Sequence, residues 1–297
     1  FIEHDLHALT YDADIWDINR VKNRIEHIIH SAQLDEHARE KQIARLQEKQ
    51  IESKNLIENK RVDNLLDRSK ERIERQLHFV KERMFIRFHD MFQEHFNPTT
   101  VTDNGRQAIV QLESNRNRLV DYVGYELLQE VRAVSLRLES FINSLLKDFY
   151  DEMGRELVTI DESITLANYE EKRFTTPNYV QAFTEIDLGK FQQALKVFKN
   201  LRSFFEQNER EKMKEIFYEI LEPEIEAYLN EQQTIMEQAY KVQLNEHFAQ
   251  LLTEANDEVS LTINQQINVL NTNIDFTVYS KKLDQINLIL DNLKSVI

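Results

Sequence analysis

The sequence predicts an all-α protein, an elongated antiparallel bundle of long helices with a short-helix tip. Three observations support this prediction. The chain of 297 residues has only four glycines and three prolines, so few residues in it favour a turn. Charged residues make up 30% of the chain and hydrophobic residues 41%, a mixture typical of long amphipathic helices. Apolar residues recur at steps of three and four over most of its length, which is the period of a helix face.

The first 106 residues are expected to form long helices with one turn. Residues 1–34 have apolar side chains at helical spacing and predict a first helix. Residues 35–96 contain neither glycine nor proline and predict a single rod, on the order of 90 Å long. Asn97 and Pro98 end this rod, and residues 99–106, which include Gly105, predict a turn. Asn97, Pro98 and Gly105 are therefore the candidate hinge residues.

The next long helix is predicted for residues 107–167, within a helical region that we place at residues 35–171. Its apolar residues follow steps of four and three, which lays one seam along one face. The seam consists of Leu127, Val131, Val134, Leu138, Phe141 and Leu145.

The C-terminal third predicts helices that return along the bundle. Residues 206–262 form a long helix that starts at a capping box, Ser203 to Glu206. Pro223 lies inside this helix and predicts a kink or a helix restart. Residues 263–297 carry two further apolar seams, and a break is expected between them at residues 275–280.

Residues 172–205 differ from the rest of the chain, and we call them the basic–aromatic segment. Six cations face two carboxylates there, a local balance of +4 in a chain whose formal net charge is -15. Thr176 and Pro177 predict a helix start, and residues 187–189 predict an interruption before a second short helix. Cations and rings together suit a lipid headgroup boundary. The candidate membrane-binding residues are Phe174, Tyr179, Phe183, Lys190, Phe191, Lys196, Phe198, Lys199, Arg202, Phe204 and Phe205.

Two other interpretations of this segment stay open. Aromatic residues at helical spacing often belong to a core, so Phe183, Phe191, Leu195 and Phe198 would then close the end of a bundle. Aromatic and arginine side chains are also enriched in protein interfaces, so a structural coiled-coil protein whose aromatic tip binds a protein partner is the alternative function. Six cations are not needed where a segment only closes the buried end of a bundle, so they favour the membrane-binding interpretation over the core interpretation.

The composition excludes several other functions. A net charge of -15 argues against nucleic-acid binding, because phosphate neutralisation needs a basic surface. Without cysteine, disulfides and thiolate metal sites are impossible. His4 with His7 and His27 with His30 have a spacing that could hold a metal, but no Glu-x-x-His sequence accompanies them, so we interpret them as solvated or half-buried. The glycines are too far apart for a phosphate-binding loop.

Three runs resemble the helical stalk of bacterial dynamin-like proteins of the Gram-positive type. They are RMFIRFHDMFQEHFNPTT (residues 83–100), LLQEVRAVSLRLESFI (127–142) and FKNLRSFFEQNEREKMKE (198–215), and the opening FIEHDLHAL is similar to the chain that leaves the GTPase domain. The resemblance implies a neck and trunk of antiparallel helices that end in a membrane-binding paddle, here residues 172–205. Because the chain begins at Phe1, we expect it to be part of a longer protein.

The resemblance also implies a function. The implied function is membrane binding and self-assembly, as the stalk of a membrane-remodelling GTPase that serves membrane fusion, fission or protection. Its partners would be anionic membrane lipids, other copies of the chain and a separate GTPase domain that binds GTP and Mg²⁺. Because the resemblance places GTP hydrolysis in that separate domain, we expect no enzymatic activity and no cofactor in this chain itself. The location implied is the cytoplasm, at the inner face of the cell membrane.

Overall fold

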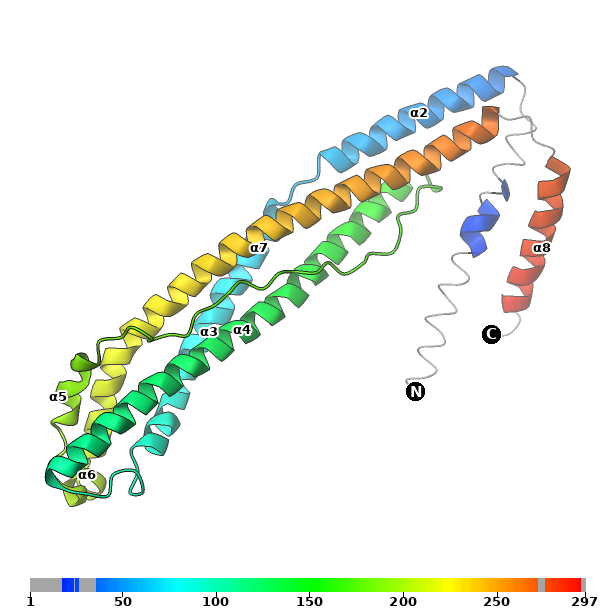
Figure 1. Ribbon diagram of the computed structural model, residues 1–297. Coiled ribbons are helices and arrows are strands. Elements are labelled where there is room, and N and C mark those ends of the chain that lie inside the picture. The colour runs from blue at the N-terminus through cyan, green and yellow to red at the C-terminus, as the bar shows by residue number, and fades with distance from the viewer. Residues whose placement is uncertain (1–17, 24, 27–35, 272–275, 295–297) are drawn as a thin grey trace. The chain divides into compact units, whose positions relative to one another are not determined.

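A computed structural model describes residues 18–23, 25–26, 36–271 and 276–294 (Figure 1). Among these residues the chain contains helices and no strand, so the all-α prediction is confirmed. Residues 18–23 and 25–26 are helical. His4, His7, His27 and His30 lie outside the described residues. The helices are α2 (Glu36–Glu58), α3 (Asp63–His95), α4 (Gly105–Ile160), the 3-10 helix η1 (Leu188–Phe191), α5 (Gln192–Leu195), α6 (Leu201–Glu206), α7 (Glu209–Asn271) and α8 (Phe276–Lys294).

The chain divides into two compact units. Unit 1 takes in Phe1–Arg61, Leu146–Glu171 and His247–Ile297, and unit 2 takes in Val62–Leu145 and Lys172–Glu246. Both α4 and α7 contribute residues to each unit. The whole basic–aromatic segment lies in unit 2.

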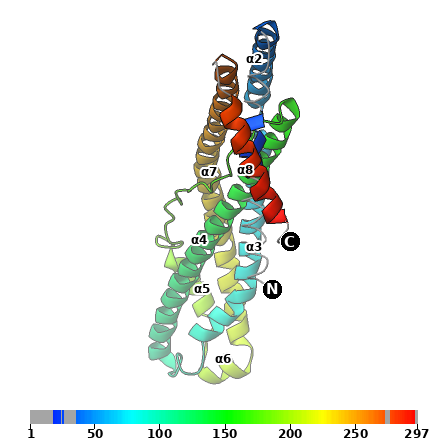
Figure 2. The ribbon, with the colours of Figure 1, turned by 90° about the vertical axis from the view of Figure 1, so that its right-hand side faces the viewer.

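Unit 2 is built on α3 and the adjoining parts of α4 and α7, which run beside one another (Figures 1 and 2). Arg83 of α3 forms an ion pair with Glu130 of α4 at 2.8 Å, and Lys81 of α3 pairs with Glu226 of α7 at 3.0 Å. The predicted seam on α4 is buried at Leu127, Val131, Val134, Leu138 and Leu145. Phe141 is only half-buried, and its ring lies 5.2 Å from the Arg72 guanidinium.

α5 and α6 lie at one end of unit 2 (Figure 1). Phe191, directly before α5, belongs to a cluster of buried rings. Phe92 and Phe96 stack with their centroids 4.5 Å apart, and Phe217 packs edge-on against both. Phe191 joins the cluster at 4.9 Å from Phe217. Each fully buried ring contributes about 1.5–3 kcal/mol, so this cluster is a major part of the core of unit 2.

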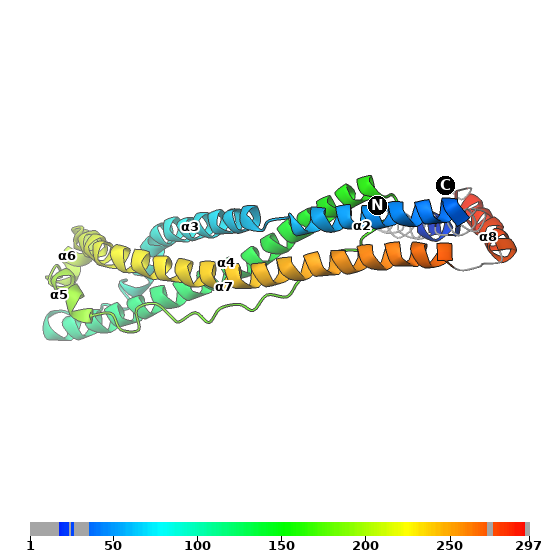
Figure 3. The ribbon, with the colours of Figure 1, turned by 90° about the horizontal axis from the view of Figure 1, so that it is seen from above.

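Unit 1 contains α2, which runs beside the unit 1 part of α7 (Figure 3). Two ion pairs join α2 and the residues just after it to the end of α4. Lys49 Nζ lies 2.9 Å from Asp161 Oδ2, and Lys60 Nζ donates to both carboxylate oxygens of Glu156 at 2.7 Å. Phe149 of α4 packs on Phe248 of α7, with centroids 4.9 Å apart.

The predicted single rod over residues 35–96 is wrong, because residues 59–62 separate α2 from α3. The last carbonyls of a helix need donors from elsewhere. Here Arg61 Nη1 donates to the carbonyls of Glu58 and Lys60, each at 3.0 Å. The Arg61 side chain therefore caps the end of α2 at a place where the sequence has neither glycine nor proline.

The predicted end at Asn97 and Pro98 is confirmed, since α3 stops at His95. The Asn97 side chain forms a local turn in which its Oδ1 accepts from the Thr99 backbone N–H at 2.8 Å. Gly105 begins α4 with φ +65°, a conformation that few residues other than glycine adopt readily. The role of Asn97, Pro98 and Gly105 as a hinge stays a prediction.

Several predicted helix ends differ from the structure. The helix predicted to reach Ala167 ends at Ile160, and residues 161–187 contain no helix. Thr176 and Pro177 therefore start no helix. The capping box at Ser203 is also wrong, because the Asn200 side chain caps α6 by accepting from the Ser203 N–H at 2.9 Å.

Two further differences concern the C-terminal third. Helix α7 starts at Glu209, passes through Pro223 and continues to Asn271, without a break at 262. Of the predicted break, residues 276–280 are helical, and residue 275 lies outside the described residues.

Candidate functional site

The first part of the basic–aromatic segment, residues 172–183, has no helix, and we call it the strap. Side-chain amides from two helices hold its backbone. Asn143 of α4 accepts from the Lys172 N–H at 2.8 Å and donates to the Lys172 carbonyl at 2.9 Å. Gln243 of α7 accepts from the Thr175 N–H at 2.6 Å and donates to the Thr175 carbonyl at 3.0 Å. Each amide thus pairs with both backbone groups of one residue, as a neighbouring β-strand would.

Buried tyrosines anchor the strap further along. Tyr179 is 4% exposed, and its hydroxyl lies 2.5 Å from Ser135 Oγ. The Tyr228 hydroxyl donates to the Val180 carbonyl at 3.0 Å, and the Tyr240 hydroxyl donates to Glu139 at 2.8 Å. Burial, with a smaller effect of the Glu231 charge, raises the pKa of Tyr228 to about 12. These tyrosines are therefore neutral hydrogen-bonding groups of the core.

The strap ends where its backbone meets α4 at Gly124. A Cβ atom at this position would lie 2.3 Å from the Ala182 carbonyl oxygen, so only glycine allows this approach. The next residue, Phe183, has φ 68°, which is rare and costly for a bulky side chain. Asn143, Gln243 and Gly124 were not among the residues predicted from the sequence. An isolated glycine inside a helical pattern was the one signal that pointed to a close backbone approach.

Three of the predicted membrane-binding rings belong to the core, which corrects that prediction. Tyr179 is 4% exposed, and Phe191 and Phe204 are 0% exposed. Phe191 packs on Phe217, and Phe204 packs between Phe198 and Phe205 at centroid distances of 5.3 and 5.0 Å. None of the three can contact lipid in this conformation.

The other predicted rings, Phe174, Phe183, Phe198 and Phe205, are half-buried. The centre of the Phe174 ring lies 6.0 Å from that of the buried Tyr240 ring, so Phe174 also helps to hold the strap against α7. Phe198 and Phe205 lie on either side of the buried Phe204 ring and leave part of their surface open.

The predicted cations are all exposed. Lys190 forms an ion pair with Glu224 at 2.6 Å, and the hydrogen bond and charge of that carboxylate raise the pKa of Lys190. Lys199 lies 3.4 Å from Glu209, and Arg202 lies 3.1 Å from Glu206. The side chains of Lys199 and Arg202 nevertheless remain 76% and 79% exposed. Lys196 has no ion-pair partner among the residues that the structure describes.

The structure therefore brings a smaller set together than the sequence predicted. We call residues 196–205 the α6 surface. Lys196, Lys199 and Arg202 are exposed on it, and its half-buried apolar side chains are Val197, Phe198, Leu201 and Phe205. Asn104 fixes this surface to the loop before α4, because its side chain accepts from the Leu201 N–H at 2.9 Å.

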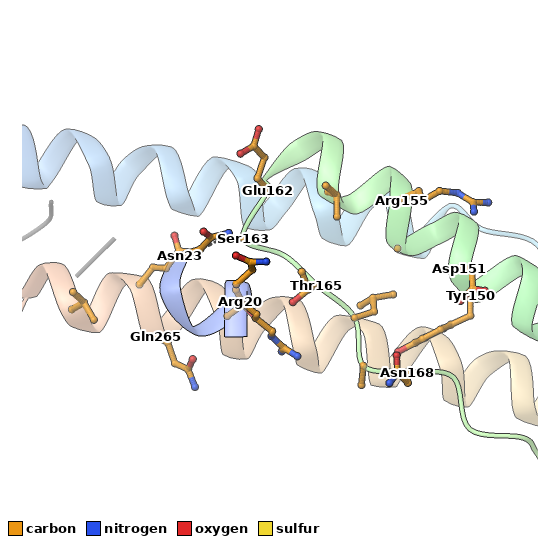
Figure 4. A pocket seen from close by; sticks show the side chains of 18 of the residues that line it. Arg20, Asn23, Tyr150, Asp151, Arg155, Glu162, Ser163, Thr165, Asn168 and Gln265 are labelled. Atoms are coloured by element: carbon orange, nitrogen blue, oxygen red, sulfur yellow. Dashed lines mark hydrogen bonds between the residues drawn. The ribbon is translucent and has the colours of Figure 1, made fainter. Parts of the chain in front are cut away.

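A second feature, a cleft of about 980 Å³, lies in unit 1 and was not predicted. Figure 4 shows its walls, with Tyr150 and Arg155 on α4, Thr165 and Asn168 on the extended segment after α4, and Gln265 on α7. Arg20 and Asn23 close it from the short helix near the N-terminus. These residues come from distant parts of the chain and share no sequence motif, so no pattern could have indicated the cleft.

Neither a metal cluster nor a membrane span is found in the part of the chain that the structure describes. No group of three or more histidine or acidic side chains there is placed to hold a metal ion. No described helix combines the length and the apolar character that crossing a bilayer requires.

No family model matches this chain, and comparisons with curated proteins and with solved structures found no match.

Proposed function

We propose that this chain is the membrane-binding and self-associating stalk of a dynamin-like, membrane-remodelling GTPase, and that the α6 surface makes the lipid contact. One observation carries the proposal: three exposed cations lie within seven residues, on a surface with four half-buried apolar side chains. This surface lies in a chain whose formal net charge is -15. An anionic bilayer would be repelled by most of such a chain, so the contact has to be local.

The contact should be weak in a single copy. Each cation near an anionic surface contributes about 1 kcal/mol. Glu209 and Glu206 already neutralise part of the charge of Lys199 and Arg202, so these two cations contribute less than that. Stable attachment would therefore need several copies on one membrane, which agrees with a self-associating stalk.

GTP and Mg²⁺ do not fit the residues of this chain, so both belong to a separate domain in this proposal. Gly124 and Gly154 lie inside α4, Gly189 lies in η1, and Gly105 is followed by Arg106 rather than by the rest of a phosphate-binding loop. The chain itself then has no enzymatic activity. Its proposed partners are anionic lipids, further copies of itself and the GTPase domain, at the cytoplasmic face of the cell membrane.

The test is sedimentation of the full chain with vesicles of graded anionic lipid content, at low and at moderate salt. We expect pelleting that increases with anionic lipid and falls as salt screens the charges. The triple variant Lys196→Glu, Lys199→Glu and Arg202→Glu should weaken binding about tenfold or more.

A matched control is Lys54→Glu, Lys70→Glu and Arg75→Glu, which removes three exposed cations from α2 and α3. Lys54 and Lys70 each have a glutamate four residues later, as Arg202 has. The control should bind like the unaltered chain. Equal binding by both triple variants, or no pelleting of the unaltered chain with any vesicle, would refute the α6 surface as the lipid contact.

A protein partner is the second candidate function, favoured by the shallow burial of Phe198 and Phe205 and by the Arg210 guanidinium, which lies 5.9 Å from the centre of the Phe205 ring. Aromatic and arginine side chains are enriched in protein interfaces. A surface of this kind would ignore the lipid composition of the vesicles, so the same experiment separates the two functions.

A further inference from the structure

A groove of about 780 Å³ lies between α3 and α7 in unit 2, and we call it the α3/α7 groove. Its lining residues extend from Glu74 to Ile86 on α3 and from Tyr218 to Gln233 on α7. Phe85 and Ile86 are 59% and 70% exposed there. The Phe85 ring packs edge-on against Tyr218, with centroids 4.8 Å apart, which holds it at the groove. Large apolar side chains that gather at an exposed groove indicate an interaction surface.

The α3/α7 groove is acidic. Four carboxylates against one lysine leave three negative charges, with His78 neutral. The five charged residues are Glu74, Glu82, Glu222, Glu226 and Lys81. An anionic lipid surface would be repelled by this groove, and so would the same groove of a second copy. The occupant therefore has to be both apolar and cationic.

The α6 surface has the complementary chemistry. Residues 196–205 carry three cations and no carboxylate, so their charge of +3 matches the three negative charges of the groove. Their half-buried apolar side chains include Phe198, Leu201 and Phe205, which would find apolar partners in Phe85 and Ile86. Apolar contact together with charges of opposite sign is the arrangement of a specific protein interface.

Within one chain the α6 surface cannot reach the groove. Phe204 is fully buried, and the Asn104 side chain accepts from the Leu201 N–H at 2.9 Å, so α6 is fixed in its place. Two residues join α6 to α7. The groove begins at Tyr218, nine residues after the start of α7, which is about 14 Å further along that helix. A contact between the two surfaces therefore has to form between two copies.

We propose that the α6 surface of one copy docks into the α3/α7 groove of a second copy. The contact joins two different patches, so it is a head-to-tail contact. Helix α6 has six residues and is about 9 Å long, and α3 lines the groove from Glu74 to Ile86, over about 18 Å, so the helix fits within it.

The docked cations are the ones proposed to contact lipid, so one copy cannot make both contacts at once. The head-to-tail contact is then the state of the protein away from the membrane, and association on a membrane uses other surfaces. This competition with lipid rests on the proposed function, whereas the contact between copies does not.

The test is sedimentation equilibrium of the full chain without vesicles, at low and at moderate salt. We expect the mass to rise with protein concentration at low salt, and less so at moderate salt, because salt screens the charges. The triple glutamate variant of the α6 surface should associate about tenfold more weakly or less, because like charges then meet. The groove variant Glu74→Lys, Glu82→Lys and Glu222→Lys should lose association to the same degree. Undiminished association of either variant, or no association of the unaltered chain, overturns the proposal.

A mixture of these two variants is the sharpest measurement. It offers an acidic α6 surface to a basic groove, so the mixture should associate although neither variant does so alone. The control Glu71→Lys, Glu231→Lys and Glu246→Lys changes three exposed carboxylates of α3 and α7 outside the groove and should associate like the unaltered chain. A mixture that fails to associate, or a control as weak as the groove variant, contradicts docking in the groove.

The lipid contact and the contact between copies fail in different ways. A chain that pellets with anionic vesicles but stays at the mass of one copy without them refutes only the contact between copies. A chain that self-associates but ignores every vesicle refutes only the lipid contact. At protein concentrations where the unaltered chain self-associates, the groove variant should pellet with anionic vesicles more completely than its control of equal charge. Equal pelleting of the two would overturn the competition.

Discussion

Gly124 and Gly154 both lie inside α4, yet only Gly124 is required by its surroundings. A Cβ at position 124 would clash with the Ala182 backbone at 2.3 Å, and backbone cannot rotate away as a side chain can. A Cβ at position 154 would lie 3.6 Å from the Leu166 side chain, an ordinary contact. The two glycines thus differ in their tolerance of a side chain, because backbone lies against Gly124 and a side chain lies against Gly154.

This contrast gives the first prediction. Gly124→Ala should destabilise the chain by about 1–3 kcal/mol, because the strap has to move away from α4. Gly154→Ala should be neutral or stabilise by up to about 1 kcal/mol, because alanine favours the helix. Urea unfolding followed by circular dichroism measures both. Equal effects of the two substitutions would mean that the strap does not press on Gly124.

Asp161 gives a pH-dependent prediction. Burial acts to raise its pKa, but hydrogen bonds from Ser163 and Lys49 outweigh burial and hold the pKa below the ordinary 3.8. A carboxyl whose pKa is lower in the folded than in the unfolded chain contributes stability above its unfolded pKa. That contribution is lost as the pH falls through the folded value.

Asp161→Asn should therefore destabilise the chain near neutral pH, with a difference from the unaltered chain that shrinks as the pH falls below about 4. Thermal unfolding at a series of pH values measures this difference. Asp151→Asn, which changes an exposed carboxylate on α4, is the control. A difference for Asp161→Asn that is constant with pH would show that the ionised Asp161 carboxylate does not contribute to the stability of the chain.

The sequence predicted individual rings less well than it predicted helices. Periodicity indicates which face of a helix is buried, so the seam from Leu127 to Leu145 was predicted correctly except at the half-buried Phe141. The rings of the basic–aromatic segment lie mostly outside long helices. Their burial is decided by partners distant in the chain, as when Phe217 covers Phe191. Composition alone cannot distinguish such a ring from one that faces solvent.

At the scale of elements, the strap replaces the helix that was expected from Thr176 and Pro177. A helix satisfies its own backbone groups, whereas an extended segment needs donors and acceptors from its neighbours. Asn143, Gln243 and Tyr228 supply them here. Local sequence preferences at residues 172–183 could not reveal this, because the groups that decide it lie on α4 and α7.

The strap gives a prediction for hydrogen exchange. Gln243→Ala should speed exchange of the Thr175 amide about tenfold, because that N–H loses its acceptor, while the overall unfolding free energy changes little. Gln250→Ala is the control, since Gln250 lies on the same helix and its amide donates to Glu254, four residues later on that helix. Unchanged exchange at Thr175 in the Gln243 variant would show that the amide pairing does not hold the strap.

The break between α2 and α3 could likewise not be predicted from local sequence preferences. Residues 59–62 contain neither glycine nor proline, and the contacts made there are those of the Arg61 side chain with nearby carbonyls and of the Lys60 side chain with Glu156 of α4. The end of α3, in contrast, was predictable, because Asn97 and Pro98 act locally. A helix end is thus predictable where a residue such as Pro98 acts on its own backbone. It is not predictable where the contacts come from residues far away in the chain.

At the scale of the whole molecule, each unit is assembled from separate stretches of the chain. The α6 surface, proposed to contact lipid, belongs to unit 2, and the residues that line the cleft belong to unit 1.

The amide pairing between Asn143 and Lys172 has a consequence for protein engineering. It places the end of one unit 2 stretch, at Leu145, close to the start of the other, at Lys172. A gene in which a short glycine-rich loop joins Leu145 directly to Lys172 would encode unit 2 as one uninterrupted polypeptide. Such a miniature protein would keep the strap, its tyrosine anchors and the α6 surface, and it would allow lipid binding to be measured on that unit by itself.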